Sequence, residues 1–161
     1  MSGIRKSAVA GKAFVGPLGL AGDEQADTTV HGGLDKAVYA YPVEHYAWWI
    51  EQRRTSVMFP ELPYGSFGEN LTTAGVLEAS LFVGDVLLFA DCTLRVTQPR
   101  SPCFKFNAVM DDPAAHRRMR ETGFSGFYLA VDRPGTLAAG EEFEVIPGQR
   151  RVPLMSLFRF A

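Results

Sequence analysis

The sequence predicts a mostly β protein, built as a closed or nearly closed β-barrel with two or three short helices. Seven or eight short strand-like segments outnumber the helical ones and do not alternate with them regularly, which argues against a doubly wound parallel sheet. Sixteen glycines, ten prolines and twelve phenylalanines indicate many turns around an aromatic-rich core. Closing the sheet would also remove exposed strand edges. A chain of 161 residues suits one domain, and we expect a single domain over residues 1–161.

The expected strands are short apolar or alternating runs between turn signals. They lie at residues 7–15, 36–41, 67–72, 84–90, 92–98, 125–131, 142–146 and 155–160. The clearest alternation is at 92–98, where Leu94 and Val96 are separated by polar residues, as in a half-buried strand. This strand leads directly into a segment at residues 99–107 that carries the most distinctive chemistry of the chain.

Two segments have helical spacing. The first is expected to open at Pro42, where the missing N–H is no loss. Its core-facing residues recur at helical spacing: Val43, Tyr46, Ala47 and Ile50. The second is expected between Asp112 as N-cap and Gly123 just past its end. Residues 55–66 lack periodicity, and we interpret them as a long surface excursion that could serve as a lid.

Net charge and cysteine content limit the binding partners and the cellular compartment that we expect. A net charge of −2 gives no general attraction to nucleic acid or to an anionic membrane, so any anion site must be a local cluster. No run approaches the ~20 apolar residues that span a bilayer. Cys92 and Cys103 are too few for a disulfide framework, and a bridge between them is disfavoured rather than ruled out. We expect a cytoplasmic protein.

Cys103 is the first candidate for a reactive or metal-ligating residue. Arg100 precedes it by three residues and Lys105 follows it by two, and nearby positive charge favours the thiolate, the soft ligand and nucleophile among side chains. Pro99 and Pro102 stiffen the approach to it. The alternative is that Cys103 is a small buried hydrophobe, because free cysteine is among the most buried residue types. Cys92 has no such neighbours and is expected to be inert packing.

Polar residues around this segment form candidate binding groups. Arg100, Lys105 and Asn107 could together hold a phosphate, through a bidentate fork, a point charge and an amide. The alternative is a solvated basic turn, and spacing alone does not decide between them. Glu69 and Asn70 either line a pocket or only shape a turn, and spacing leaves this open as well.

The three histidines differ in their surroundings. His31 precedes two glycines and could form an anion- or ring-binding turn, although a plain tight turn is the commoner outcome. His45 lies among aromatic residues of the first helix and is expected to pack at the edge of the core. His116 is flanked by arginines and is expected to be solvated.

Several catalytic classes lack their motifs. There is no Cys-x-x-Cys, no His-Glu-x-x-His and no other zinc-ligand spacing. No Gly-x-Ser-x-Gly elbow of a serine hydrolase occurs. A Walker loop and a dinucleotide glycine fingerprint are also missing, so the sequence indicates neither phosphate cleavage nor a nicotinamide or flavin site.

Taken together, a series of short segments resembles the MOSC domain family, and most closely its stand-alone YiiM-type members. In family order these segments are LGLAGDEQ at 18–25, HGGLDKAV at 31–38, YPVEHY at 41–46, FGENL at 67–71, GD at 84–85 and QPRSPCFK at 98–105. Each motif is weak alone, but their shared order from about residue 8 to residue 146 is specific. The sequence given ends at Ala161, whereas YiiM-type members often continue into a helical extension.

The resemblance implies a barrel of the MOSC, pyruvate-kinase-like type with a pocket for the molybdenum cofactor, a pterin that carries a dithiolene and a phosphate. The family cysteine matches Cys103, which would either ligate molybdenum or carry sulfur as a persulfide; soft thiolate donors suit such a centre. The cofactor-binding side chains would be His31, Lys36, Glu69, Asn70, Arg100, Ser101, Lys105 and Asn107. Pyridoxal phosphate binding is a further property that membership of the family would imply.

The resemblance leaves more than one function open. The first is a molybdenum-dependent reductase of N-hydroxylated compounds such as hydroxylaminopurines, with Cys103 at the metal. Its electrons would come from a partner protein with a flavin or an iron–sulfur centre, and it could act as a homodimer. The second is a non-catalytic carrier of the cofactor or of sulfur. The third is an interaction domain in which Cys103 is structural.

Overall fold

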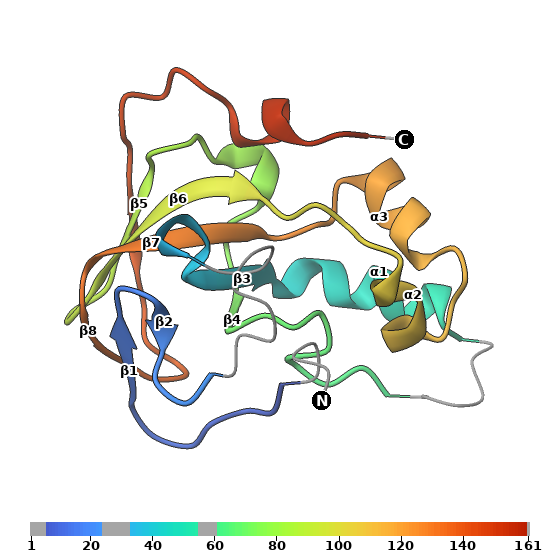
Figure 1. Ribbon diagram of the computed structural model, residues 1–161, viewed down its shortest axis with the longest axis horizontal. Helices are drawn as coiled ribbons and strands as arrows, with labels where there is room; N and C mark the ends of the chain where they lie inside the picture. The colour runs from blue at the N-terminus through green and yellow to red at the C-terminus, as the bar shows by residue number, and fades with distance from the viewer. Residues whose placement is uncertain (1–5, 24–32, 55–60, 161) are drawn as a thin grey trace.

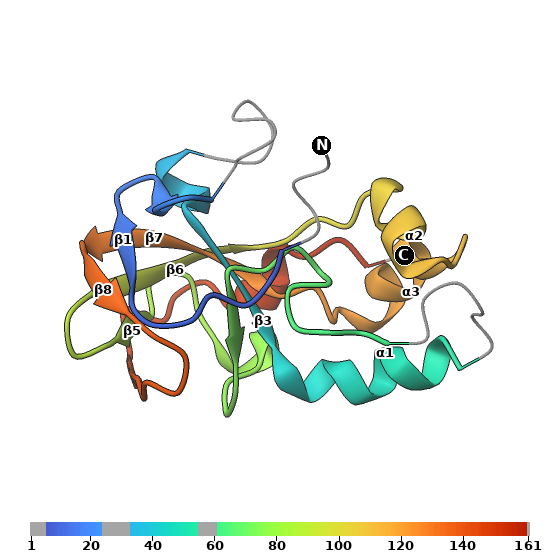
Figure 2. The ribbon, with the colours of Figure 1, turned by 90° about the horizontal axis from the view of Figure 1, so that it is seen from below.

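The computed structural model describes residues 6–23, 33–54 and 61–160 of the chain (Figure 1). It is mostly β, as the sequence predicts, and its strands form two sheets. The three-stranded sheet lies at one end of the molecule and the α-helices gather at the other, which both ribbon views show (Figures 1 and 2). Among the described helices, none combines the length and the apolar character that crossing a bilayer requires.

The larger sheet has six strands in the order β4-β3-β7-β6-β5-β9. Its strands are β3 (Val38–Pro42), β4 (Leu71–Thr73), β5 (Val86–Leu88), β6 (Thr93–Pro99), β7 (Phe127–Arg133) and β9 (Glu144–Ile146). β3 and β4 are parallel, and the other neighbours are antiparallel. β6 and β7 pair with two register shifts, which increase the local twist and help the sheet to curl.

The smaller sheet has the order β2-β1-β8, with β1 (Ala13–Gly16), β2 (Gly19–Leu20) and β8 (Gly135–Leu137). β8 follows β7 almost at once, so the chain crosses from one sheet to the other at Pro134. The result is a curled half-barrel. The closure that the sequence predicts is not found among the described strands, because the outer strands of the large sheet, β4 and β9, are only three residues long and do not pair with each other.

The described α-helices are α1 (Tyr46–Gln52), α2 (Lys105–Met110) and α3 (Ala115–Thr122). The 3-10 turns are η1 (Leu34–Lys36), η2 (Val43–His45), η3 (Glu78–Ser80) and η4 (Leu154–Leu157). Pro42 is the last residue of β3 rather than the first of a helix, since η2 intervenes before α1. The stop expected for the second helix is confirmed: Gly123 follows α3 with a φ of 73°, the left-handed conformation that glycine adopts freely.

Two sequence expectations at the surface are wrong. The segment 155–160 is not a strand; it begins within η4, because Leu154 and Phe158, four residues apart, are the buried positions there. Ala47 and Ile50 were expected on the core face of the first helix, but both are exposed, Ile50 to 50%. α1 is only two turns long, and Tyr46 and Trp49 alone bury its inner face.

β3 divides the core into two parts because side chains alternate across a strand. Val38 and Ala40 face the cluster inside the curled sheet, with apolar residues of β5, β6 and β7. Tyr39 and Tyr41 face a second, aromatic cluster beneath the helices. There the ring of Tyr41 stacks on that of Phe67 at 3.9 Å between centroids. Both faces of β3 are therefore buried, and Tyr39 lies on the side from which the candidate site is built.

Candidate functional site

Cys103 lies on the short loop that joins β6 to α2. β6 ends at Pro99 and α2 begins at Lys105, so the thiol is held between two regular elements. Cys103 is half-buried and is a free thiol, as is the fully buried Cys92, so the disulfide that the sequence disfavours is not formed. The sequence placed Cys103 after a strand, and this is confirmed. The helix α2 that follows was not foreseen.

Arg100 points into the protein rather than out to solvent. It is 6% exposed, and its Nη1 donates hydrogen bonds to the Tyr39 hydroxyl, at 3.2 Å, and to the Phe67 carbonyl. Its guanidinium carbon lies 4.9 Å from the ring centroid of Tyr39 and 5.9 Å from that of Phe106. Within the described residues no carboxylate pairs with Arg100, and its Nε and Nη2 bond to no protein group. A buried cation without an ion pair carries a desolvation cost, so it marks a place where an anion would be stabilised.

Arg100 influences the pKa of both neighbouring tyrosines, and Cys103 influences that of Tyr128. Burial raises the pKa of Tyr39 and of Tyr128, and the charge of Arg100 opposes this rise in both. A negative charge on Cys103 acts in the same direction as burial on the pKa of Tyr128. Burial lowers the pKa of Arg100, but Tyr39, Tyr128 and Cys103 more than offset this. Thiol, guanidinium and Tyr128 phenol therefore share one electrostatic neighbourhood.

Lys36 adds a second cation to this neighbourhood. Its Nζ lies 5.6 Å from the ring centroid of Tyr128, within the range of a cation–π contact. Lys36 ends η1, two residues before β3 begins at Val38, and β3 pairs with β7 so that Tyr39 lies opposite Tyr128. We call Lys36, Tyr39, Arg100, Cys103 and Tyr128 the Cys103 cluster. The sequence resemblance named Lys36, Arg100 and Cys103. In the structure Lys36 contacts the Tyr128 ring, and Arg100 and Cys103 both influence the pKa of the same tyrosine.

Glu69 does not face the Cys103 cluster. Its buried carboxylate accepts hydrogen bonds from the Tyr46 hydroxyl, from the Gly65 and Phe67 backbone N–H groups at 2.9 and 3.0 Å, and from the Thr72 hydroxyl at 3.1 Å. Burial, and then the negative charge of Glu69, raise the pKa of Tyr46. Because all its partners are internal, Glu69 stabilises the turn that places the Phe67 carbonyl within hydrogen-bond reach of Arg100.

Asn70 also has internal partners. Its Oδ1 accepts the Tyr39 N–H at 2.8 Å, and its Nδ2 donates to Asp23 at 2.7 Å. Its own N–H donates to the Tyr39 carbonyl at 2.8 Å. Asn70 therefore fixes the backbone of β3 at the residue whose hydroxyl contacts Arg100. Of the two readings that the sequence left open for Glu69 and Asn70, the turn-shaping one describes their contacts.

The remaining predicted binding residues differ in position. Ser101 and Lys105 are exposed on either side of Cys103. The Asn107 amide instead joins α2 to α3, since its Oδ1 accepts the His116 N–H at 2.8 Å and its Nδ2 donates to the Pro113 carbonyl at 2.8 Å. His31 lies outside the described residues, as do residues 55–60 of the predicted lid.

The other two histidines are both partly or fully buried. His45 is buried, as predicted, and its Nε2 lies 2.7 Å from the Glu78 carboxylate. His116 was expected to be solvated but is half-buried, with its Nδ1 3.0 Å from Asn107 Oδ1. The expectation failed because α2 was not foreseen, and α2 is the element that carries Asn107 to His116.

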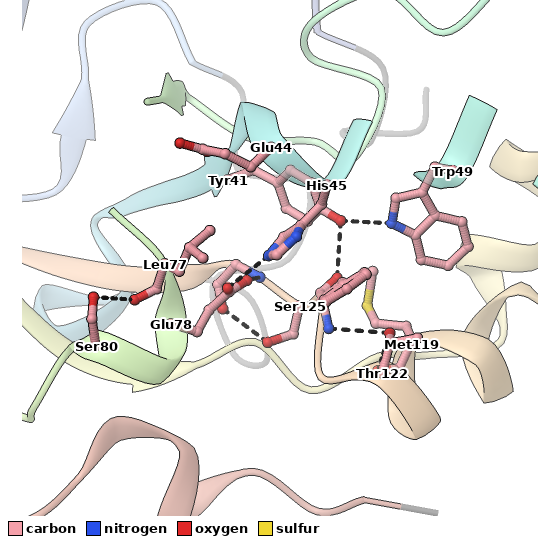
Figure 3. A network of polar contacts seen from close by, with 12 residues as sticks. Tyr41, Glu44, His45, Trp49, Leu77, Glu78, Ser80, Met119, Thr122 and Ser125 are labelled. Carbon is pink, nitrogen blue, oxygen red and sulfur yellow. Dashed lines mark hydrogen bonds and ion pairs between the residues drawn. The ribbon is translucent and has the colours of Figure 1, made fainter. Parts of the chain in front are cut away.

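Sequence reasoning missed Tyr39 and Tyr128 as site residues. Both belong to alternating strands, where an aromatic residue is read as core, and both are indeed nearly buried. The strand period carries a signal: Tyr39 and Tyr41 lie on one face of β3, and the family resemblance places Lys36 at the start of the predicted strand 36–41. Figure 3 shows the polar network behind this face, in which Tyr41, His45, Glu78 and Ser125 take part.

Replacing Tyr39 by phenylalanine is expected to lower the free energy of unfolding by about 1–3 kcal/mol, because it removes one hydroxyl that serves two buried partners. The Tyr39 hydroxyl donates to the Ser125 carbonyl at 2.6 Å and accepts from Arg100. Urea denaturation of Tyr39→Phe measures the change. Tyr64→Phe, at an exposed tyrosine, is the control and should stay within about 0.5 kcal/mol. Equal values for the two variants would contradict the bridging role of Tyr39.

The donor set fits a cofactor better than a bare metal ion. In the described part of the chain, no group of three or more His, Cys, Asp or Glu side chains could hold a metal ion. Cys103 offers one soft donor with cations around it. A molybdenum centre that brings its own dithiolene sulfurs and an anionic phosphate needs little more from the protein than one thiolate and positive charge, so these residues fit that group.

Comparison with known proteins identifies the family. The MOSC domain profile matches residues 27–144, and the chain belongs to the MOSC domain family. It is 38% identical over 149 residues to protein YiiM of Escherichia coli (strain K12), covering 90% of this chain and 64% of that one. It is 34% identical over 147 residues to a protein named Reductase of Gibberella moniliformis, covering 90% of this chain and 26% of that one. The chain thus spans less than two thirds of the length of these curated relatives.

Solved structures agree with this assignment. The crystal structure of YiiM from Escherichia coli superposes with a TM-score of 0.77 at 32% identity, covering 92% of this chain and 69% of that one. That of YiiM from Geobacillus stearothermophilus gives 0.78 at 31% identity, covering 96% and 70%. The resemblance drawn from the sequence is confirmed. MOSC domains are associated with the molybdenum cofactor, which directs the functional question to the Cys103 cluster.

Proposed function

We propose that this chain binds the molybdenum cofactor at the Cys103 cluster and reduces N-hydroxylated compounds of the hydroxylaminopurine type. The observation that carries the proposal is the buried guanidinium of Arg100, which has no carboxylate partner in the described structure and shares an electrostatic neighbourhood with the half-exposed thiol of Cys103. A cation in such a place is well suited to an anionic cofactor, and a thiolate to a soft metal. The similarity to YiiM and to a protein named Reductase supports a reductive activity.

Each residue of the site has a role in this proposal. Cys103 supplies the protein thiolate to the metal, while Arg100 and Lys36, with the exposed Ser101 and Lys105, hold the phosphate or the pterin edge. The cofactor would supply the two-electron chemistry of the reduction. Conversion of an N–OH to an N–H group consumes two electrons and two protons and releases water.

The electrons would come from a partner protein that carries a flavin or an iron–sulfur centre, because the sequence carries no nicotinamide or flavin fingerprint. The site is suited to such a donor in one respect: Phe104, beside Cys103, is 73% exposed and Lys105 is exposed, so the loop reaches the surface. Assembly as a homodimer is part of the same proposal.

A second candidate function rests on that same exposure. A half-buried thiol on a surface loop could carry sulfur as a persulfide, or hold the cofactor for delivery, without turnover of its own. Turnover separates the two candidates. Molybdenum-loaded protein that reduces 6-hydroxylaminopurine with a reduced viologen dye supports the reductase, and loaded protein that never does so under these conditions supports the carrier.

Metal analysis tests binding directly. The protein is produced in medium with molybdate, desalted, and analysed beside Cys103→Ala and Cys92→Ala. We expect the molybdenum content of Cys103→Ala to fall by about tenfold or more, because the metal loses its protein ligand. Cys92→Ala, which removes the other free thiol, should retain it. Equal molybdenum in wild type and Cys103→Ala would remove Cys103 as the ligand, and no molybdenum in wild type would overturn the proposal.

A further inference from the structure

The side chain of Tyr128 is nearly buried, and its hydroxyl has no hydrogen-bond partner among the described residues. We propose that Tyr128 is an anion-binding residue: its hydroxyl donates a hydrogen bond to one oxygen of a phosphate group whose other oxygens are held by Arg100. Where that phosphate is the cofactor's, the inference rests on the proposed function. Where it is inorganic phosphate, it does not.

Strand pairing places Tyr128 close to Arg100. Tyr128 lies opposite Tyr39 in the pairing of β7 with β3. The Arg100 N–H, just past the end of β6, donates to the Gly126 carbonyl, just before β7 begins, at 3.2 Å. The side chains meet at Tyr39: its ring centroid lies 4.9 Å from the guanidinium carbon of Arg100 and 5.3 Å from the ring centroid of Tyr128. Arg100 and Tyr128 therefore contact the same ring.

The hydroxyl of Tyr128 differs from those of the other buried tyrosines. The hydroxyls of Tyr39 and Tyr41 donate to backbone carbonyls, at 2.6 and 2.9 Å, and that of Tyr46 donates to a buried carboxylate. Tyr128 is only 9% exposed, yet within the described structure no protein group accepts its hydroxyl hydrogen. Because burying a hydroxyl without a partner is unfavourable, this hydroxyl indicates a hydrogen bond that a ligand completes.

Arg100 offers one edge of its guanidinium to the same ligand. Its Nη1 is used by the Tyr39 hydroxyl and the Phe67 carbonyl, while its Nε and Nη2 bond to no described protein group. The N–H groups of Nε and Nη2 are parallel along one edge of the planar group, and such a pair can hold two oxygens of one oxyanion. A phosphate group has a further oxygen for a third donor.

Tyr128 is suited to be that third donor. Burial raises its pKa by more than the charge of Arg100 lowers it, so the phenol is protonated at neutral pH and can donate. The Nζ of Lys36 lies 5.6 Å from the ring centroid of Tyr128, which adds positive charge beside the same side chain. A hydroxyl donor close to two cations favours an anion over a neutral ligand.

The test compares binding of inorganic phosphate with stability in the metal-free protein. Isothermal titration calorimetry at constant ionic strength gives the Kd for wild type and for Tyr128→Phe, which keeps the ring and removes only the hydroxyl. We expect Tyr128→Phe to weaken phosphate binding by about five- to fiftyfold, because it removes one hydrogen bond to a charged group. The midpoint of its urea denaturation should stay at the wild-type value or rise, since no protein group loses a partner.

Tyr41→Phe is the matched control and should behave in the opposite way. The Tyr41 hydroxyl accepts from Trp49 at 2.7 Å and donates to the Phe124 carbonyl, so its partners lie within the core (Figure 3). Its loss should lower the midpoint of urea denaturation and leave the phosphate Kd near the wild-type value. A midpoint lowered as much in Tyr128→Phe as in Tyr41→Phe would mean that the protein already satisfies the Tyr128 hydroxyl, and would overturn the inference.

Phosphate binding that is equal in wild type and Tyr128→Phe, or absent from wild type, also overturns the inference. Molybdenum content, measured in protein produced with molybdate, separates these results from the proposed function. Weaker phosphate binding by Tyr128→Phe, in a protein whose wild type holds no molybdenum, would overturn the proposed function and leave the role of Tyr128 standing. Molybdenum in wild type, with phosphate binding that Tyr128→Phe does not change, would do the reverse.

The same measurement distinguishes the two sources of phosphate. If the site holds the phosphate of the cofactor, Tyr128→Phe should contain less molybdenum than wild type as well as bind phosphate more weakly. If phosphate binding is weakened and molybdenum is retained in full, Tyr128 serves free phosphate.

Discussion

Inorganic phosphate is expected to stabilise this protein, and Arg100→Met is expected to abolish that effect while changing the free energy of unfolding in buffer by only about 1–2 kcal/mol. The substitution loses the hydrogen bonds to Tyr39 and Phe67, at about 1–3 kcal/mol for each buried group left without a partner. It also relieves the burial of a cation that no carboxylate pairs with in the described structure. Replacing a buried ion with an apolar side chain of similar length is often neutral for this reason. This pair of results would attribute the buried charge of Arg100 to binding rather than to folding.

Urea denaturation with and without phosphate, at matched ionic strength, measures both effects. A site with phosphate at a hundred times its Kd stabilises the wild type by about 2.7 kcal/mol. Arg100→Met should show none of this, and Arg100→Lys should show part of it, because lysine keeps the charge without the planar fork. Arg54→Met, at an exposed arginine, is the control. An undiminished phosphate effect in Arg100→Met would show that the anion binds elsewhere.

Cys103 and the residues around it show which parts of the candidate site could be predicted from the sequence. Its position after a strand was predicted correctly, because the alternation of 92–98 and the prolines beside Cys103 are local signals. The clustering of Lys36, Arg100 and Cys103 was implied by the family motifs. That Arg100 points inward could not be predicted, because its partners Tyr39 and Phe67 lie 61 and 33 residues away.

Glu69 and Asn70 illustrate the opposite case. Both were assigned to a pocket by resemblance, and the structure gives both a full set of internal partners. Sequence cannot distinguish a carboxylate that binds a ligand from one that binds backbone N–H groups, because both uses place an acidic residue next to glycine. His45 and Glu78, 33 residues apart, show the same limit: packing of His45 was predicted, and its carboxylate partner was not.

Closure of the barrel is a third feature that could not be predicted from the sequence. Strand existence follows from local pattern, but closure depends on whether the edge strands are long enough to meet. Here β4 and β9 are each three residues long, and their sequences carry no pattern that predicts such short edge strands. The predicted strand at 155–160 failed for a related reason: its apolar residues suit an alternating pattern as well as the four-residue spacing that places Leu154 and Phe158 in the core.

Glu69→Ala is expected to lower the free energy of unfolding by about 3–5 kcal/mol, because it leaves several buried hydrogen-bond donors without an acceptor. The Gly65 and Phe67 N–H groups lose their acceptor, as does the Tyr46 hydroxyl. Glu69→Gln should lose less, since one amide oxygen still accepts, but its NH₂ group would face backbone N–H donors. The turn at 65–69 would loosen, and with it the Phe67 carbonyl that Arg100 contacts.

The midpoint of urea denaturation measures this loss, and Glu51→Ala is the control, because Glu51 is exposed and its ion pair with Arg54 should contribute no more than about 0.5 kcal/mol. Comparing the two variants thus separates the stability contributed by the buried carboxylate of Glu69 from that contributed by the exposed carboxylate of Glu51. If Glu69 instead acted mainly on a ligand, Glu69→Ala would leave the midpoint near that of Glu51→Ala and lower only the phosphate or molybdenum bound. A large shift of the midpoint with phosphate stabilisation partly retained is the result that the hydrogen bonds of Glu69 predict.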